Sequence, residues 1–392
     1  MTPLGISHYT LTTALGAGCR AQTEALFAER SGLSDRAFES CALPTWIGEV
    51  AGLDTPLSSE YADWDCRNNR LAELGLMQDG FADAVAVART RLGAARIGVF
   101  IGTSTSGVLQ TEHAYRERGG DPECLPLWFH HRETQNSFSV ADYVRLRLGL
   151  AGIAVAVSTA CSSSAKVFAS AQRAIAAGFC DAAVVGGIDS LCLTTLYGFN
   201  ALQLLSNEPC RPGDAQRRGL SIGEAAGFAL LEPDAGHALR LEGFGESSDA
   251  YHMSSPDPDG RGARDAMREA LRRAGVEASA VDYINLHGTA TPANDLAEDK
   301  AVCALFGHDT PCSSTKGWTG HTLGAAGIVE AGLALLCIEA GHVPRSLNTR
   351  TVDPLLRGNI LRESKPLPLR RVMSNSFGFG GNNCSLLFGR AL

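Results

Sequence analysis

The feature that most constrains the fold is an alternation of short apolar runs and longer alanine-rich segments. Residues 97–102, 153–159 and 182–188 are apolar runs of strand length. Residues 162–178, between the last two, show an amphipathic pattern of helical length that ends in glycine. This order predicts a layered α/β fold in which most strands pair in parallel.

The second part of the chain repeats this order of elements. Strand-like runs lie at residues 281–286 and 384–388, and helical patterns at residues 295–306 and 323–340. A polar stretch containing proline and glycine separates the two parts at residues 232–237. The order of elements therefore predicts two related halves, residues 1–235 and 236–392.

Composition narrows the function classes. The chain has 392 residues, 45% of them hydrophobic, enough to bury a large core. A formal net charge of -8 argues against nucleic acid as the partner. No basic start followed by a compact apolar stretch marks an export signal, and no apolar run approaches the roughly 20 residues of a membrane span. We therefore expect a cytoplasmic protein that acts without a membrane.

The twelve cysteines form no CxxC pair, so neither a zinc site nor a redox motif is indicated. Most should be reduced thiols packed in the core. Cys161 differs because it follows the strand-like run at residues 153–159 and opens the next helix. The amides at a helix start favour negative charge, which predicts a lowered thiol pKa and a nucleophile able to attack a thioester. An ordinary buried cysteine remains the alternative.

Two histidines lie in glycine-flanked turns. His287 ends the strand-like run at residues 281–286, and His321 lies just before the helical pattern at residues 323–340. Ligand-binding and catalytic groups in open α/β sheets gather at the carboxyl ends of strands, so both histidines are candidate catalytic residues. The alternative is that each is a solvated loop histidine. Residues 375–383 (NSFGFGGNN) carry enough glycine for a close approach of backbone amides to a ligand, although a tight hairpin is also possible.

Four blocks together resemble one family. They are VSTACSSSAKVFASAQRAIAAG, NLHGTATPANDLAED, STKGWTGHTLGAAGIVEAG and SNSFGFGGNNCSLLF. In this order they are similar to the β-ketoacyl carrier-protein synthases of the elongating type, which have a thiolase-like duplicated α-β-α-β-α fold. The similarity extends from about Ile97 to the C-terminus.

The resemblance implies a decarboxylative condensation of an acyl thioester with malonyl-carrier protein. Cys161 would take the acyl chain from the phosphopantetheine of an acyl carrier protein, so no resident cofactor or metal is expected. His287 and His321 would stabilise the enolate that forms when the malonyl group loses carbon dioxide. Lys316 and Glu330 would organise the second histidine.

Further roles follow from the same resemblance. The backbone amides of Cys161 and Phe379 would form the oxyanion hole, and Phe379 would also be the gate beside the cysteine. Thr289 and Thr291 would contact pantetheine, and Thr105 would line the acyl tunnel.

The set of one cysteine and two histidines also distinguishes this chain within the superfamily that it resembles. The degradative thiolases of that superfamily have a Cys/His/Cys set and its initiating synthases have a Cys/His/Asn set, so the resemblance favours a decarboxylative elongating enzyme. Some positions depart from the family pattern. The first strand is atypical, the segment RPGD at residues 211–214 lacks an aromatic residue after the proline, and Asn382 replaces a usual threonine. These departures leave the acyl preference open and make a specialised polyene-like or pigment pathway an alternative to fatty-acid synthesis.

Carrier proteins are acidic, so a basic landing surface is expected. The candidates by family position are Arg67, Arg70, Arg211, Arg217 and Arg218, with a solvated charged face as the alternative. A homodimer is expected, and a mixed dimer with a chain-length partner is possible.

Two rival functions remain. Residues 219–223 satisfy the G-x-S-x-G pattern of serine hydrolases at Ser221, but a polar loop precedes the pattern and a strand-like run follows it. A non-catalytic chain-length subunit is the other rival, and the presence of Cys161 and both histidines argues against it.

Overall fold

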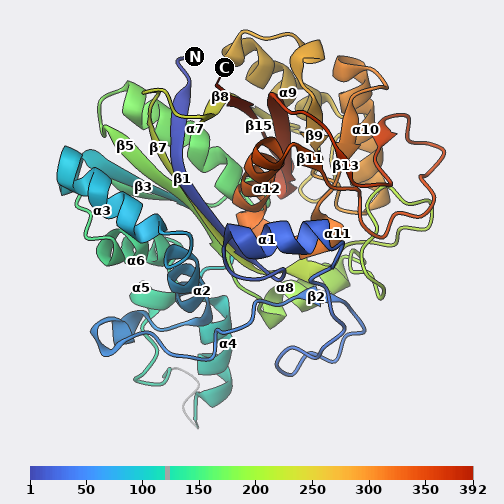
Figure 1. The fold of residues 1–392 in the computed structure, drawn as a ribbon. Helices are drawn as coiled ribbons and strands as arrows, with labels where there is room; N and C mark the ends of the chain where they lie inside the picture. The colour runs from blue at the N-terminus through green and yellow to red at the C-terminus, as the bar shows by residue number, and fades with distance from the viewer. Residues whose placement is uncertain (120–123, 392) are drawn as a thin grey trace.

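The computed structural model describes residues 1–119 and 124–391, and one large mixed sheet dominates these residues (Figure 1). In spatial order its strands are β12 (Asn359–Ile360), β10 (Pro311–Ser313), β9 (Tyr283–Asn285), β14 (Arg371–Gly378), β15 (Asn382–Arg390), β8 (Leu239–Ser248), β1 (Leu4–Thr13), β7 (Ala225–Pro233), β5 (Ala182–Asp189), β3 (Ile97–Gly102) and β4 (Ala154–Val157). Two small sheets pair β2 (Ile47–Gly48) with β6 (Ile222–Gly223), and β11 (His342–Val343) with β13 (Lys365–Pro366).

The large sheet consists of two halves with the same topology. The order β1-β7-β5-β3-β4 in the first half matches β8-β15-β14-β9-β10 in the second, and the matched strands follow each other in the same chain order. In both halves the last three strands are parallel and the first two pairings are antiparallel. A short antiparallel pairing of β1 with β8 joins the halves. The prediction of two similar halves is confirmed, and the connection between β7 and β8 contains the proposed boundary at residue 235, which stays a prediction.

Helices lie on both faces of each half. They are α1 (Gly18–Phe27), α2 (Arg67–Leu76), α3 (Phe81–Leu92), α4 (Val108–Glu117), α5 (His131–Thr134), α6 (Ser139–Arg147), α7 (Ser163–Ala176), α8 (Leu193–Ala201), α9 (Arg261–Ala274), α10 (Pro292–Phe306), α11 (Lys316–Thr319) and α12 (Ala326–Ala340). Short 3-10 turns are η1 (Ser59–Trp64), η2 (Ala94–Arg96), η3 (Ala278–Ala280), η4 (Leu323–Ala325) and η5 (Phe379–Gly381).

The two most buried helices, α7 and α12, form the middle layer. They pack against each other and against strands of both halves, while α2, α3 and α6 cover the outer face of the first half and α9 and α10 that of the second (Figure 1). The resulting α-β-α-β-α order is the predicted thiolase-like fold. Because α7 and α12 follow the matched strands β4 and β10, their amino ends meet near the centre of the molecule.

One helical stretch, Leu323–Ala340, is long and apolar enough to cross a membrane, contrary to the expectation that no such run exists. Most of it, 83%, is buried inside the fold, as in the core helix of a globular domain. Its apolar character is explained by its contacts with strands of both halves of the large sheet.

Helix boundaries differ slightly from the sequence expectations. Helix α10 begins at Pro292, three residues before the expected start, because proline is well suited to the first helical position. The regular part of α12 begins only at Ala326, since Leu323 has a φ of +52° that no α-helix accommodates. That deviation lies two residues after His321.

Candidate active site

Cys161 lies in the turn between β4 and α7 and is 6% exposed. The preceding residue, Ala160, has a left-handed φ of +52°, and the Ser163 side chain fixes this turn. Its Oγ accepts the Thr159 N–H at 2.9 Å and donates to the Ala160 carbonyl at 2.6 Å. The nucleophile candidate is thus held by a strained, hydrogen-bonded turn.

Small residues at the start of α7 permit close packing. A Cβ on Gly102 would lie 2.3 Å from the amide nitrogen of Ser164, and one on Gly327 would lie 2.3 Å from that of Ala165. The first turn of α7 is therefore in backbone contact with β3 and with α12.

Each histidine is fixed through its backbone. The N–H groups of His287 and Gly288 donate to the two carboxylate oxygens of Glu298 on α10, both at 2.8 Å. The His321 N–H donates to the Ser221 carbonyl at 2.7 Å, and the His321 carbonyl accepts from Gly223 at 2.9 Å. The backbone of His287 is thus anchored to α10, and the backbone of His321 is anchored to the segment that contains β6.

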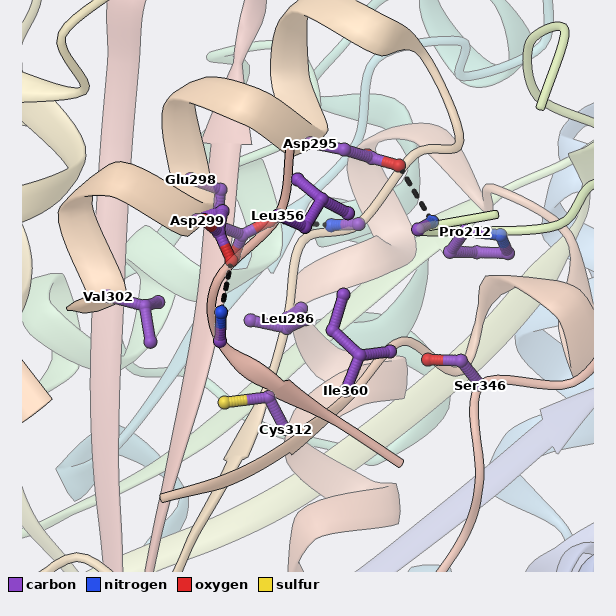
Figure 2. A pocket seen from close by; sticks show the side chains of 13 residues that line it. Pro212, Leu286, Asp295, Glu298, Asp299, Val302, Cys312, Ser346, Leu356 and Ile360 are labelled. Atoms are coloured by element: carbon purple, nitrogen blue, oxygen red, sulfur yellow. Dashed lines mark hydrogen bonds between the residues drawn. The ribbon is translucent and has the colours of Figure 1, made fainter. Parts of the chain in front are cut away.

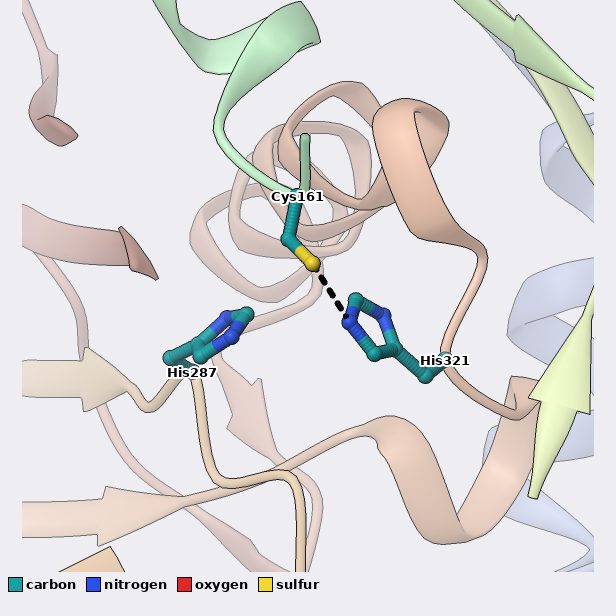
Figure 3. Close-up of side chains that lie close together, drawn as sticks. All are labelled: Cys161, His287 and His321. Carbon is teal, nitrogen blue, oxygen red and sulfur yellow. Dashed lines mark hydrogen bonds between the residues drawn. The ribbon is translucent and has the colours of Figure 1, made fainter. Parts of the chain in front are cut away.

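The structure brings Cys161, His287 and His321 together (Figure 3). Sγ of Cys161 lies 3.0 Å from Nε2 of His321. The two imidazole centroids are 5.4 Å apart and nearly perpendicular, at 85°. Because the ligand atoms of all three side chains lie within 4.8 Å of one another, one small substrate group can contact all of them.

All three groups are neutral near pH 7. Burial raises the pKa of the Cys161 thiol to about 12, while the charge of Lys316 and the backbone amide of Phe379 act in the opposite direction. Burial and the charge of Lys316 lower the pKa of both histidines well below their usual range. The expectation that the helix start lowers the pKa of this thiol is therefore wrong, because desolvation outweighs the favourable charges. A neutral imidazole at 3.0 Å can instead accept the thiol proton.

Lys316 and Glu330 form a buried pair behind the site, each side chain 2% exposed. The Lys316 ammonium also donates to the His287 carbonyl and lies 3.4 Å from His287 Nδ1. The pair thus contacts the first histidine, which corrects the expectation that it organises the second. An ammonium cannot accept a proton, so Nδ1 of His287 is the acceptor and Nε2 carries the hydrogen toward the cavity.

The glycine-rich segment closes over the nucleophile. A Cβ on Gly378 would lie 3.2 Å from the Cys161 amide nitrogen, and the next residue, Phe379, stacks on Phe199 with centroids 5.6 Å apart. Gly380 adopts a φ of +77° and donates its N–H to the Met253 carbonyl at 2.7 Å. The backbone at Gly378 therefore passes close to the nucleophile candidate, and the approach of its amides to a ligand stays a prediction.

A cavity of about 300 Å³ opens onto the three side chains. Phe199, Leu220, Phe377 and Phe379 give it an apolar wall, while Thr289 and Thr291 lie on its polar side with their hydroxyls 2.9 Å apart. The two threonines therefore line the same cavity as Cys161. A second cavity behind α10, of about 20 Å³, has space for roughly one water molecule (Figure 2).

Thr105 does not line this cavity. It is buried, and its hydroxyl and backbone N–H both donate to Oδ1 of Asp189, at 2.9 and 3.0 Å. In this conformation its polar atoms serve a buried carboxylate and not an acyl chain.

Two of the five predicted carrier-contact arginines are paired with carboxylates inside the fold. Arg67 forms two hydrogen bonds to the fully buried Glu224, and Arg217 is 6% exposed and pairs with Asp295 and Asp353. The charge of Arg217 is neutralised inside the fold, so the prediction is wrong for Arg217, whereas the Arg67 side chain is 15% exposed and its carrier-protein contact stays a prediction.

The other three arginines differ in their availability. Arg70 is paired with Asp65 and Arg211 with Glu208, and both are partly exposed. Arg218 is exposed and has no ion-pair partner among residues 1–119 and 124–391.

Ser221 does not fit a hydrolase nucleophile. It leads into β6 and β7 instead of a helix, it is fully buried, and its Oγ accepts the Cys210 N–H at 3.1 Å. The motif match is coincidental, because its function here is to hold the backbone beside His321.

Sequence reasoning missed Glu298 and Asp189, which each accept several backbone amides next to the site. The sequence did contain a signal for Asp189, since it is a carboxylate that directly ends the apolar run of β5.

The cysteine and the two histidines also have the spacing that a soft divalent ion such as zinc can bridge. The Lys316 ammonium disfavours a second cation at this place because it lies 3.4 Å from His287 Nδ1. The arrangement fits thioester chemistry better than metal binding.

Comparison with protein families agrees with this geometry. Residues 74–237 match the model of the β-ketoacyl synthase N-terminal domain, and residues 239–350 match that of the C-terminal domain. The chain belongs to the β-ketoacyl synthase family. The Cys/His/His site of this synthase is thus formed by the two domains together.

Among sequence relatives, the synthase is 40% identical over 271 residues to the mitochondrial 3-oxoacyl-[acyl-carrier-protein] synthase of Arabidopsis thaliana. That match covers 63% of this chain and 59% of the relative, so it spans less than two thirds of that protein. It is 38% identical over 321 residues to 3-oxoacyl-[acyl-carrier-protein] synthase 2 of Vibrio cholerae, covering 76% of each.

Among solved structures, the synthase resembles the ketosynthase ApeO of Xenorhabdus doucetiae, solved in complex with its chain length factor ApeC. The TM-score is 0.91 at 38% identity, covering 100% of this chain and 98% of the other. A β-ketoacyl synthase from Burkholderia phymatum gives a TM-score of 0.89 at 30% identity, covering both chains fully.

Proposed function

We propose that this protein joins an acyl thioester to malonyl-acyl carrier protein by decarboxylative Claisen condensation, giving a 3-oxoacyl-acyl carrier protein. The observation that carries the proposal is one cavity onto which a cysteine sulfur and two neutral imidazoles open, with the sulfur 3.0 Å from Nε2 of His321 and the ligand atoms of all three side chains within 4.8 Å of one another. Relatives named 3-oxoacyl-[acyl-carrier-protein] synthase support the same reaction.

In the first half-reaction, Sγ of Cys161 attacks the acyl carbonyl of a phosphopantetheine thioester. The thiol proton passes to Nε2 of His321, which lies 3.0 Å away, and then to the departing pantetheine sulfur. The backbone amides of Cys161 and Phe379 are the proposed oxyanion hole, and the action of the Phe379 N–H on the same sulfur supports this. Phe379, stacked on Phe199, is the proposed gate.

In the second half-reaction, the malonyl thioester loses carbon dioxide and the electron pair of the broken bond enters the enolate. The His287 Nε2–H donates to the developing enolate oxygen, because Lys316 keeps Nδ1 as the acceptor. The enolate carbon then bonds to the acyl carbonyl, and the Cys161 sulfur leaves. Glu330 acts in this scheme by pairing with Lys316.

The carrier protein is the proposed partner, with Thr289 and Thr291 beside its phosphopantetheine arm. Of the basic residues, Arg218 is the best placed by exposure, followed by Arg70 and Arg211. The expectations of a cytoplasmic location and of no resident cofactor stay predictions.

We also propose that a second subunit of the same fold pairs along β4, either a copy of this chain or a chain-length partner. Strand β4 ends the large sheet, so its outer edge has no partner strand in the described residues. Its residues are only half-buried although all are apolar, and neighbouring Ile153 is 38% exposed. A complex such as that of ApeO with its chain length factor supports a mixed dimer and a specialised pathway. Native mass measurement of this 41.3 kDa chain, alone and coexpressed with a chain-length partner, distinguishes the two assemblies.

The test is a condensation assay with acyl- and malonyl-carrier proteins, read by product mass. Cys161→Ala should abolish 3-oxoacyl product, whereas the matched control Cys384→Ala, a buried cysteine on β15, should retain it. Native product formation by Cys161→Ala would overturn the proposal.

A further inference from the structure

Asp189 is a buried carboxylate with no cationic partner. It ends β5, is 0% exposed, and within the described ranges no Lys, Arg or His nitrogen lies within ion-pair distance of it. Buried charges are normally paired, so its charge must be stabilised in another way. Backbone and hydroxyl donors from two separate segments supply that stabilisation.

The first segment is the loop that connects β3 to α4. Thr103 donates its hydroxyl to Oδ1 at 2.7 Å, the Ser104 amide donates at 2.8 Å, and the Thr105 amide and hydroxyl donate at 3.0 and 2.9 Å. The next residue, Ser106, has a left-handed φ of +47°. The carboxylate thus holds this loop in one particular conformation.

The second segment is the one that carries His321. The Gly324 N–H donates to Oδ2 at 2.6 Å, and Leu323 just before it has a φ of +52°. A Cβ on Gly324 would lie 2.7 Å from that same oxygen, so only glycine allows the contact. The opposite side of His321 is held by the Ser221 carbonyl and the Gly223 amide.

These contacts fix the His321 segment from two directions. Hydrogen bonds to β6 hold the histidine's own backbone, and Asp189 holds the chain three residues later. The ring between these anchors places Nε2 3.0 Å from Sγ of Cys161 (Figure 3). A shift of the second anchor would change that distance directly.

We propose that Asp189 is a positioning residue that sets the distance between His321 and Cys161. It does so by binding the Gly324 amide and the 103–105 loop through one carboxylate. Its effect on turnover rests on the proposed condensation, but its effect on the geometry of the thiol does not.

The test compares Asp189→Asn with Asp282→Asn. Asp282 is a suitable control because it accepts two backbone amides, from Arg370 and Arg371, at the far end of β9. Condensation kinetics with carrier-bound substrates should show kcat about 10- to 100-fold lower for Asp189→Asn, with KM changed less than about threefold. The control should keep kcat within about twofold of the wild type.

A second readout separates positioning from loss of structure. Iodoacetamide alkylation of Cys161, followed by intact mass over a pH series, reports the thiol without any carrier protein. Asp189, Glu330 and Lys316 are the charged groups that act on this thiol, and the first two oppose its ionisation. Asp189→Asn should therefore move the alkylation profile to lower pH, whereas Asp282→Asn should leave it unchanged.

If Asp189→Asn does not fold, Ser104→Ala removes one hydroxyl donor to the same carboxylate and takes its place in the kinetic comparison, with no alkylation shift expected because the Asp189 charge is kept. Equal kcat for the Asp189 and Asp282 variants, with superimposable alkylation profiles, would overturn the inference. A wild-type protein without condensing activity but with the expected alkylation shift would refute the proposed function and leave the role of Asp189 intact.

Discussion

Replacement of Lys316 by methionine tests how the site controls the proton on His287. The substitution removes an ammonium that is buried with Glu330 and lies 3.4 Å from His287 Nδ1, and it retains a side chain of similar length. The expected consequences concern both stability and rate.

The stability loss follows from the broken ion pair. Removing one partner of a buried pair typically costs about 3–5 kcal/mol. Burial raises the pKa of Glu330 to about 7 even beside Lys316, so its carboxyl can take up a proton in the variant and limit the loss to about 3 kcal/mol. At roughly 2 °C per kcal/mol for a large domain, Tm should fall by about 6 °C.

The rate loss follows from the tautomer of His287. Without the ammonium, Nδ1 is no longer held as an acceptor, and Nε2 no longer donates reliably to the enolate oxygen. Losing one such donor lowers kcat by about 10²–10³-fold. The charge of Lys316 also lowers the pKa of both histidines, so in the variant both imidazoles should protonate at higher pH and activity should fail earlier on acidification.

The assay is condensation of acyl- and malonyl-carrier proteins from pH 5.5 to 8.5, with Tm measured in parallel. Lys300→Met is the matched control, since Lys300 is 54% exposed and its partner Asp259 lies on the surface. A Lys316→Met protein that folds and condenses within twofold of the wild-type rate would refute the reasoning about His287.

Three further predictions follow from the same contacts. Because the pKa of the Cys161 thiol is raised to about 12, its alkylation by iodoacetamide should quicken by about tenfold per pH unit from pH 7 to 10, and a plateau below pH 8 would contradict this. Arg218→Glu should raise KM for carrier-protein substrates and leave Tm unchanged. Arg67→Glu should lower Tm because it places a negative charge against buried Glu224. A raised KM for Arg67→Glu with Tm unchanged, and no change in KM for Arg218→Glu, would identify Arg67 as the contact residue instead. Burial raises the pKa of Glu298 from 4.5 to about 7, so the folded state favours the protonated carboxyl. The contribution of this group to the free energy of unfolding is therefore fully present below pH 4.5, and about 3 kcal/mol of it is lost as pH rises through 7. Urea unfolding of Glu298→Gln should therefore show a weaker decline between pH 5 and 7 than the wild type, and parallel curves would be inconsistent with the raised pKa.

The sequence predicted the alternation of strands and helices because buried strands and amphipathic helices leave strong periodic patterns. It overestimated parallel pairing, since five pairings of the large sheet are parallel and five are antiparallel. Residues 97–102 coincide with β3, and the repeated pattern predicted the two similar halves but not their strand order. Helix starts were less accurate because they depend on single residues such as Leu323, whose positive φ has no signature in a leucine.

The reactive residues were found through strand ends and through the family resemblance, but their electrostatics were not. A helix start lowers a thiol pKa only if solvent or charge offsets desolvation, and the depth of Cys161 is a property of the tertiary fold. In the same way, Arg67 and Arg217 appear on a sequence as ordinary surface charges. Their partners Glu224 and Asp353 are more than 100 residues away along the chain.

Trapping the acyl-enzyme tests the central claim most directly. The wild-type protein is incubated with an acyl-carrier protein, its intact mass and cysteine peptides are measured, and malonyl-carrier protein is then added. The account predicts one acyl group on the Cys161 peptide, discharged as 3-oxoacyl product on addition of the malonyl substrate. An acyl group on another cysteine, or condensation without any acylated Cys161, would contradict it.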